Sequence, residues 1–363
     1  MTVVTRADVE TALKSYVDPY LEQDLVAAKC LGQVRIENGH VELDVELGFP
    51  AIGYRDTLIA AVRDRLAGLP GVTNIAVRVE SKIVSHEVQK GLKPLPGVKN
   101  VIAVASGKGG VGKSTTAVNL ALALSVEGAR VGLLDADIYG PSQPRMLGAD
   151  DRPTSPDGKS LNPVNSHGIQ SMSIGYLIEE ETPMVWRGPM VTQALEQLLR
   201  DTRWQDLDYL VIDLPPGTGD TQLTLSQKVP VSGAIIVTTP QDIALLDARR
   251  GFKMFEKVEV PVLGIVENMS VHICSNCGHE EHIFGEGGGQ RMAVQYQIPF
   301  LGSLPLDIRI REETDNGQPT VIAEPDSRIA ELYRDIARRA SARLSLQAKN
   351  YSHKFPNIVI QNT

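Results

Sequence analysis

The feature that most constrains this chain is a glycine-rich run of ten residues, 106–115, with the sequence SGKGGVGKST. An apolar stretch typical of a buried strand, 101–105, leads into it, and a stretch suited to a helix, 116–126, follows it. Glycines let backbone N–H groups converge on phosphate oxygens, and a helix N-terminus adds positive potential there. The order strand, glycine loop and helix therefore predicts a phosphate-binding site for a nucleotide.

Two residues near the end of this loop carry the expected chemistry. Lys113 is placed to reach the β- and γ-phosphates of ATP, and the Ser114 hydroxyl is placed to bind Mg²⁺. The other residues expected to surround the nucleotide are Gly107, Lys108, Gly109, Gly110, Val111, Gly112 and Thr115. ATP and Mg²⁺ are therefore the predicted ligands of the loop.

A second lysine, Lys108, lies so early in the loop that it cannot easily join Lys113 on the same γ-phosphate. It can instead reach the nucleotide of a second subunit across a symmetric interface, and both lysines are then catalytic. A solvated loop lysine is the alternative interpretation. The loop resembles that of the family of cell-division and chromosome-partition ATPases and the nitrogenase iron protein. This resemblance implies a nucleotide-dependent homodimer.

Acidic residues follow two other apolar strands. Asp213 ends the run 209–213, where a carboxylate suits a water-mediated contact with Mg²⁺. The N–H of Gly217, in the loop behind it, is placed to sense the γ-phosphate. Asp135 and Asp137 follow the other strand, and the resemblance implies that Asp137 orients the attacking water while Asp135 supports it. Capping of a strand-to-loop junction is the alternative role of both aspartates.

Recognition of the purine base is assigned to Asn268, which follows the apolar run 262–266. The corresponding asparagine holds the purine in relatives of this class, so the resemblance implies the same contact here. An asparagine that merely forms a turn is the alternative interpretation.

Cys274 and Cys277 have the spacing Cys-x-x-Cys. Two thiolates fill half of a tetrahedral site, and a twofold axis through this loop brings four together, enough for one bridging [4Fe-4S] cluster. Three alternatives stay open: zinc, held within one chain with His279 or His282 or shared by the four thiolates of a dimer; a redox-active pair; and a structural knuckle. Cys30 is expected to be a small buried hydrophobe.

Taken together, these motifs match one family. The phosphate loop, the runs DADIYGPS (135–142) and DLPPGTGD (213–220) and the cysteine pair resemble those of the Mrp/ApbC iron–sulfur cluster carrier ATPases, over about residues 99–340. The resemblance implies a homodimer that binds a labile [4Fe-4S] cluster at the shared cysteines, hydrolyses ATP slowly, and passes the cluster from a donor to apo-proteins. The first 85 or so residues resemble the small domain of iron–sulfur assembly factors. However, LGFPA (47–51) stands where stand-alone relatives can carry a cysteine, so docking or regulation is the expected role of this domain.

Residues 1–88 are expected to form a small α+β domain. Its predicted elements are a helix over 5–25, two strands joined by a tight turn at Asn38-Gly39, a helix over 54–66 and a strand over 76–84. Residues 89–98 are expected to be a linker, because they are rich in proline and glycine.

Apolar strands that alternate with helices predict an α/β P-loop ATPase domain over residues 99–346. Its sheet should be mostly parallel and covered by helices on both faces, because its strands are almost wholly apolar. No role is assigned to the tail, 347–363.

Composition limits the partners and the compartment that we expect for this chain. The net charge of −8 argues against a nucleic-acid partner, since phosphate-binding surfaces are basic. The chain has no apolar run of membrane-spanning length, no apolar N-terminal signal and only three cysteines, so we expect a cytoplasmic protein without a membrane partner.

Three rival functions remain at this point. A membrane-cycling or partition-type ATPase draws support from the last helix, 327–346, where four arginines interleave with apolar residues. An ATP-gated iron–sulfur reductase would keep its cluster and change its oxidation state, whereas a carrier loses the cluster to an acceptor. A scaffold without metal needs no thiol chemistry.

Overall fold

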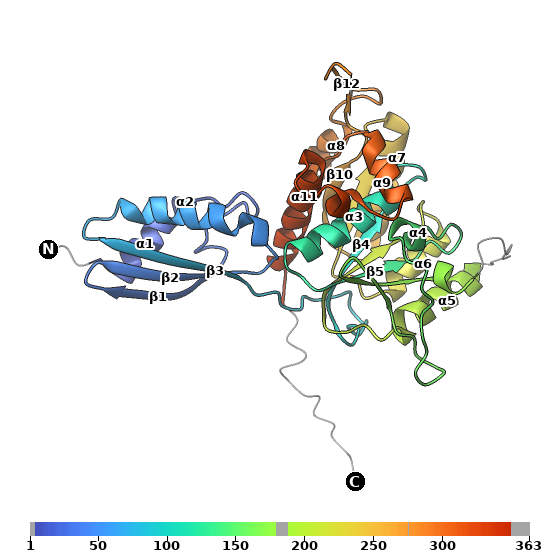
Figure 1. Ribbon diagram of the computed structural model, residues 1–363, viewed down its shortest axis with the longest axis horizontal. Coiled ribbons are helices and arrows are strands. Elements are labelled where there is room, and N and C mark those ends of the chain that lie inside the picture. Colours follow the sequence, from blue (N-terminus) through green and yellow to red (C-terminus); the bar gives the residue numbers. More distant parts are fainter. Residues whose placement is uncertain (1–3, 179–187, 275, 350–363) are drawn as a thin grey trace, which may run out of the picture.

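The long apolar runs of the second half of the chain form a single eight-stranded sheet, at the right of Figure 1. The structure, a computed structural model, describes residues 4–178, 188–274 and 276–349. In spatial order the strands are β13 (Phe300–Ser303), β10 (Val262–Glu267), β9 (Gly233–Thr238), β4 (Val98–Ala105), β8 (Leu207–Asp213), β5 (Val131–Asp135), β7 (Ile169–Ser173) and β6 (Val164–Ser166). Neighbouring strands are parallel except β6 and β7. The predicted mostly parallel sheet is therefore confirmed.

Helices cover both faces of this sheet, because strands that are apolar on both sides must be shielded from water. On one face the covering helices are α5 (Gly188–Asp201), α6 (Asp220–Lys228), α7 (Asp242–Lys257) and α8 (Gly288–Tyr296). On the other face they are α3 (Lys113–Val126), α9 (Ile308–Asp315), α10 (Thr320–Ala323) and α11 (Arg328–Ser345). Most side chains of α3 are buried, so the helix that follows the glycine loop is held firmly in the core.

The parallel arrangement gathers the predicted site at one edge of the sheet. The glycine loop follows β4, while Asp135 and Asp213 end β5 and β8. Strand β8 lies between β4 and β5, and Asp135 is the register partner of Asp213. Asn268 directly follows β10 at the same edge. Residues far apart in the sequence therefore meet at the carboxyl ends of the strands, where α/β sheets bind ligands.

A smaller unit precedes this sheet and forms the left part of Figure 1. Its elements are α1 (Arg6–Leu13), β1 (Leu31–Glu37), β2 (His40–Leu47), a 3₁₀ turn η1 (Ile52–Tyr54), α2 (Arg55–Ala67) and β3 (Asn74–Ser81). Strands β1 and β2 are antiparallel, and β2 and β3 are parallel. Asn38 and Gly39 both have positive φ between β1 and β2, so the predicted tight turn is confirmed.

The predicted first helix over 5–25 is wrong in length, because α1 ends at Leu13. The Asp18 carboxylate accepts hydrogen bonds from the backbone N–H groups of Tyr20 and Leu21, at 2.9 and 3.0 Å. These side-chain contacts replace helical ones, and Pro19 disfavours a helical conformation at the residue before it.

A buried ion pair joins the two units. Arg338 of α11 donates to Glu127, just after α3, at 2.5 Å, and to the Tyr20 hydroxyl at 3.1 Å. The other carboxylate oxygen of Glu127 accepts the N–H of Gly53 at 2.9 Å. The sequence pattern suggests that the arginines of this helix are solvated or face a membrane, but Arg338 is buried because it faces the N-terminal unit.

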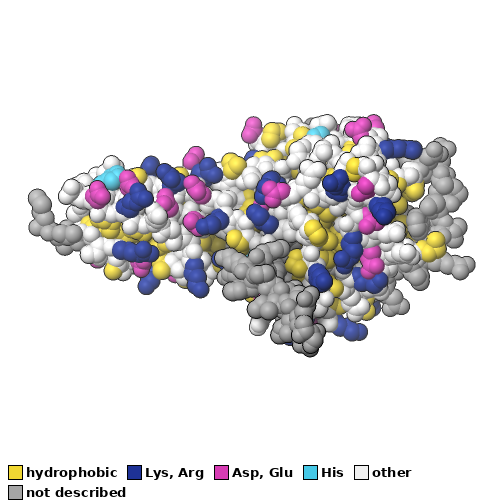
Figure 2. Space-filling model, turned by 90° about the horizontal axis from the view of Figure 1, so that it is seen from below, with side chains coloured by type: hydrophobic (Ala, Val, Ile, Leu, Met, Phe, Trp, Pro, Cys, Tyr) yellow, Lys and Arg dark blue, Asp and Glu magenta, His cyan; other side chains and the backbone are white. Residues whose placement is uncertain are grey.

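The outer surface is of mixed charge. Acidic and basic side chains are interspersed over both units on the face shown in Figure 2. On α11, Arg334 and Arg339 form ion pairs with Glu331 and Asp335 one turn away. No helix among the described residues is both long enough and apolar enough to cross a lipid bilayer.

Candidate functional site

The glycine loop has a backbone that other residues could not adopt. Gly112 has a φ of 76° and immediately precedes α3. A Cβ atom at this position would lie 2.2 Å from the amide nitrogen of Asn268. That amide nitrogen donates to the carbonyl of Val111 at 2.9 Å. Asn268 therefore holds the loop in shape from the end of β10, two strands away from β4, and its predicted contact with the purine base stays a prediction.

Lys113, the first residue of α3, is buried at the carboxyl end of β8. Its ammonium group forms an ion pair with Asp213 and lies 3.1 Å from the Ser114 hydroxyl. The lysine, the hydroxyl and the carboxylate predicted to act on ATP and Mg²⁺ thus lie in direct contact.

Asp135 is fully buried and clamps the loop that follows it through hydrogen bonds. Its carboxylate accepts the N–H groups of Asp137, Ser142 and Gln143 and the hydroxyl of Ser173, all at 3.0–3.1 Å. Burial, together with the nearby charge of Asp213, raises the pKa of Asp135 to about 7. Asp135 therefore shapes the loop that carries Asp137.

The remaining predicted residues surround this cluster. Asp137 is half-buried, and burial raises its pKa although the charge of Lys113 opposes the shift. The N–H of Gly217 donates to the Ser106 carbonyl at 2.9 Å, so this loop touches the phosphate loop directly. Lys108 lies exposed, and within the described part of the chain its ammonium group has no hydrogen-bond or ion-pair partner.

Gln143 is a site residue that sequence reasoning missed. It begins the short helix α4 (Gln143–Met146) and is buried. Its amide nitrogen donates to the Ser114 carbonyl at 3.1 Å and to the second oxygen of Asp213 at 2.9 Å. Its amide oxygen is buried without a partner among the described residues. This oxygen, with the oxygens of Ser114 and Asp213, is a donor set that fits hydrated Mg²⁺.

The cysteine pair lies in a short hairpin at the top of Figure 1. Its strands, β11 (His272–Ile273) and β12 (Glu280–Glu281), are antiparallel. The N–H of Cys274 donates to the His279 carbonyl at 2.9 Å, and the N–H of Gly278 donates back to the Cys274 carbonyl at 2.8 Å. Cys277 is exposed and Cys274 is partly exposed, so both thiols are accessible to a second molecule.

The thiol of Cys274 in the hairpin and the buried thiol of Cys30 differ in acidity. The backbone N–H groups of Cys277 and Asn276 approach the Cys274 sulfur, and the Cys277 thiol adds a further hydrogen bond, so the pKa of Cys274 lies below its ordinary value. Burial raises the pKa of Cys30 to about 11, as suits a packed side chain. Cys274 thus forms a thiolate, the form of cysteine that binds metal ions, more readily than Cys30 does.

Two histidines beside the cysteine hairpin are held by backbone carbonyls. The Nδ1 atoms of His272 and His282 lie 3.1 and 2.7 Å from the carbonyls of Leu306 and Ser270, which tie both rings to the backbone. Among the residues placed by the structure, no group of three histidine, cysteine or acidic side chains could hold a metal ion. Zinc bound by the cysteines and His279 or His282 stays an alternative prediction, and of these two rings the structure ties that of His282 to the backbone.

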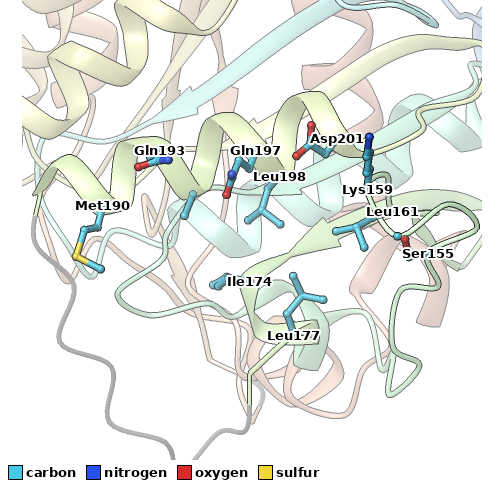
Figure 3. A pocket seen from close by; sticks show the side chains of 12 residues that line it. Ser155, Lys159, Leu161, Ile174, Leu177, Met190, Gln193, Gln197, Leu198 and Asp201 are labelled. Atoms are coloured by element: carbon cyan, nitrogen blue, oxygen red, sulfur yellow. The ribbon is translucent and has the colours of Figure 1, made fainter.

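A cavity elsewhere in the domain is lined by other residues. It has a volume of about 590 Å³ and lies between α5 and a 3₁₀ turn, η2 (Ile174–Tyr176). Figure 3 shows Leu161, Leu177 and Leu198 around it. None of the predicted site residues lines this cavity.

Comparison with known proteins places these features in a family. Residues 97–341 match the model of the NUBPL iron-transfer P-loop NTPases, and residues 6–77 match that of an iron-sulfur cluster assembly protein family. The iron-sulfur cluster carrier protein of Escherichia coli K12 is 52% identical over 345 residues, which are 95% of this chain and 94% of that protein. The iron-sulfur cluster transfer protein NUBPL of Mus musculus is 54% identical over 266 residues, 73% of this chain and 83% of that protein.

Solved structures agree on the fold. An ADP-bound nucleotide-binding protein from Archaeoglobus fulgidus is 37% identical, with a TM-score of 0.55 over 64% of this chain and 90% of its own. The cell-division ATPase MinD of Pyrococcus furiosus has a TM-score of 0.51 at 22% identity, over 66% of this chain and 97% of its own, which shows the shared fold alone. The first family model covers most of the chain, and close relatives match nearly its full length. The chain therefore belongs to the NUBPL iron-transfer P-loop NTPase family, which confirms the resemblance predicted from its motifs.

Proposed function

We propose that this chain is an ATP-hydrolysing carrier that binds a labile [4Fe-4S] cluster between two copies of itself and transfers it to apo-proteins. The observation that carries the proposal is that one chain combines an assembled phosphate site with a pair of accessible cysteines in one hairpin. Membership of an iron-transfer NTPase family, and relatives named as cluster carriers, support it.

In the proposed ATPase reaction, Lys113 leaves Asp213 and binds the phosphates of ATP. Its ammonium group pairs with Asp213, and the phosphates of ATP offer it a stronger concentration of negative charge. When Lys113 turns to the β- and γ-phosphates, Asp213 is released to hold Mg²⁺ together with Ser114. The ion, when bound, neutralises charge on the phosphates. Asp137, in the loop clamped by Asp135, then orients the attacking water.

A second copy completes the phosphate site. Lys108 is exposed at the surface of the loop and has no partner among the described residues, so its charge is available to a facing subunit. Facing phosphate loops related by a twofold axis would each receive Lys108 from the other chain. The extra positive charge would stabilise the phosphoryl group as it is transferred.

The same twofold axis serves the cysteines. Cys274 and Cys277 supply two sulfur ligands from an accessible hairpin, and a facing hairpin supplies two more. Four thiolates satisfy one [4Fe-4S] cluster, and the exposure of the hairpin keeps the cluster within reach of a donor and of apo-protein acceptors.

The two halves are linked through the end of β10. Asn268 donates to Val111 in the phosphate loop. Two residues later the carbonyl of Ser270 lies 2.7 Å from Nδ1 of His282, just beyond the cysteine hairpin. A change in loop shape on nucleotide binding can therefore reach the hairpin through one short segment.

The three free cysteines suit a reducing setting, so we place the protein in the cytoplasm.

Cluster transfer tests this function. The protein, loaded anaerobically, is incubated with an apo-enzyme that needs a [4Fe-4S] cluster, in the presence of a ferrous chelator that captures released iron. We expect the acceptor to gain activity as the carrier loses its cluster absorption. A cluster that stays bound and only changes oxidation state would identify a reductase instead.

A further inference from the structure

Gln143 occupies a position that neither the family motifs nor the predicted roles explain. It is 1% exposed and lies between the end of β8 and the start of α3. Both partners of its amide nitrogen, the Ser114 carbonyl and a carboxylate oxygen of Asp213, are acceptors. The amide can therefore have only one orientation, in which the nitrogen and not the oxygen contacts these two acceptors.

This orientation leaves the amide oxygen buried without a donor among the described residues. A buried carbonyl without a hydrogen bond is unfavourable, and an apolar side chain of the same length would remove the penalty. A glutamine here is advantageous if a hydrogen-bond donor reaches its amide oxygen when nucleotide and Mg²⁺ bind. Ser114 and Asp213, the two residues that its nitrogen contacts, are the expected holders of hydrated Mg²⁺, and metal-bound waters donate strong hydrogen bonds.

The backbone of Gln143 adds a second link. Its N–H donates to Asp135 at 3.1 Å, beside the N–H of Ser142 at 3.0 Å. One residue thus connects the loop that carries Asp137 to the first turn of α3 and to Asp213. A change in metal occupancy sensed at its side chain reaches this loop directly.

We propose that Gln143 is a positioning residue of the ATPase site, whose nitrogen orients Asp213 and whose oxygen accepts a hydrogen bond from a water of the Mg²⁺ hydration shell. The proposal rests on the nucleotide half of the proposed function and is independent of the cluster. Partners of this kind around a metal typically alter its affinity by 10- to 100-fold when they are replaced.

The test measures Mg²⁺ affinity without turnover. A fluorescent ATP analogue is bound to the full-length protein, and MgCl₂ is titrated into wild type, Gln143→Met and, as a control, Gln290→Met on the exposed surface of α8. Methionine keeps the length of the side chain and removes both polar atoms. We expect the apparent Mg²⁺ dissociation constant to rise about tenfold in Gln143→Met. Nucleotide affinity without Mg²⁺ should be unchanged, and the control should match wild type.

A second variant checks that the effect comes from the polar atoms of Gln143. Gln143→Leu also removes both of them but has a different shape, so we expect the same rise of about tenfold in its Mg²⁺ constant. An unchanged constant in Gln143→Met would overturn the proposal. A wild-type constant in Gln143→Leu would also overturn it, because the effect of the methionine would then come from its shape and not from the lost polar atoms. Failure of wild type to bind the analogue would refute the proposed ATPase function itself.

Discussion

The phosphate site and the cysteine hairpin are built in opposite ways. At the phosphate site, Lys113, Asp135 and Asp213 are buried, Lys113 forms an ion pair with Asp213, and Gln143 donates to both aspartates. In the hairpin, two strands of two residues each flank a turn in which Cys277 is exposed and Cys274 is partly exposed. The first site is assembled from buried contacts within one chain, whereas the second presents two accessible thiols.

This contrast suggests a division of labour. A preorganised buried site suits chemistry on a nucleotide, because its groups need little rearrangement when charge develops. An exposed and incomplete site suits cargo that must be received and released. The predictions below test whether the two regions are separable, as the contrast implies.

The largest effect is expected from Cys274→Ala combined with Cys277→Ala. Because these thiols are the proposed ligands, anaerobic reconstitution with iron and sulfide should leave no cluster absorption. ATP affinity should stay within about twofold of wild type, because the hairpin contributes no residue to the phosphate site. Cys30→Ala is the matched control and should bind the cluster normally. A large loss of ATP binding in the double variant would show that the regions are not separable.

Lys113→Gln should lower the ATP hydrolysis rate by about 10³-fold, since the group that contacts the transferred phosphate loses its charge. The glutamine can still donate to the buried Asp213. Cluster binding should persist, while transfer to an apo-enzyme should weaken if hydrolysis drives it. Transfer at the wild-type rate by this variant would refute the coupling through Asn268 and Ser270.

Lys108→Ala should lower hydrolysis by about 10²-fold, as expected for loss of one charged group that stabilises the transition state. Mixing this variant with Lys113→Gln provides the sharper experiment. In a mixed dimer, one site has its own Lys113 and receives Lys108 from the other chain, so an equal mixture should recover about a quarter of wild-type activity. If Lys108 acts only within its own chain, no activity will return.

The smallest effect concerns thiol acidity. Because backbone N–H groups lower the pKa of Cys274, its reaction with iodoacetamide should reach half-maximal rate at a pH below that of an ordinary cysteine. Cys30 should resist reaction across the same range, because burial raises its pKa to about 11. Mass spectrometry of peptides from Cys277→Ala and wild type measures both rates. A Cys274 profile matching free cysteine would mean that the hairpin does not activate its thiol.

The parts of the fold that could be predicted are those with strong local patterns. The strand from Val131 to Asp135 is buried on both faces and therefore appears in the sequence as an unbroken apolar run. The short strands β7 and β13 were not predicted, because Gln170 and Ser171 interrupt the apolar pattern of one and the other has only four residues. The first helix was predicted too long, because the turn formed by the Asp18 side chain has no periodic signature.

In the candidate site, too, the residues that could be predicted are those with a strong local pattern. The glycine loop and the aspartates at strand ends stand out by type and spacing, and the structure brings them into contact. Gln143 has no such signal, because its role arises only when α4 folds back on Ser114 and Asp213. Arg338 was interpreted as part of a solvated stripe, since the helix pattern does not show that a second unit packs against it.

Native mass spectrometry of the anaerobically reconstituted protein tests the central claim most directly, because it counts chains, iron and sulfide in one particle. We predict a species of two chains with one Fe₄S₄ unit, which dissociates into metal-free single chains in the variant lacking Cys274 and Cys277. A single chain that retains iron or zinc, or a dimer with a separate metal in each subunit, would contradict the shared site on which this account rests.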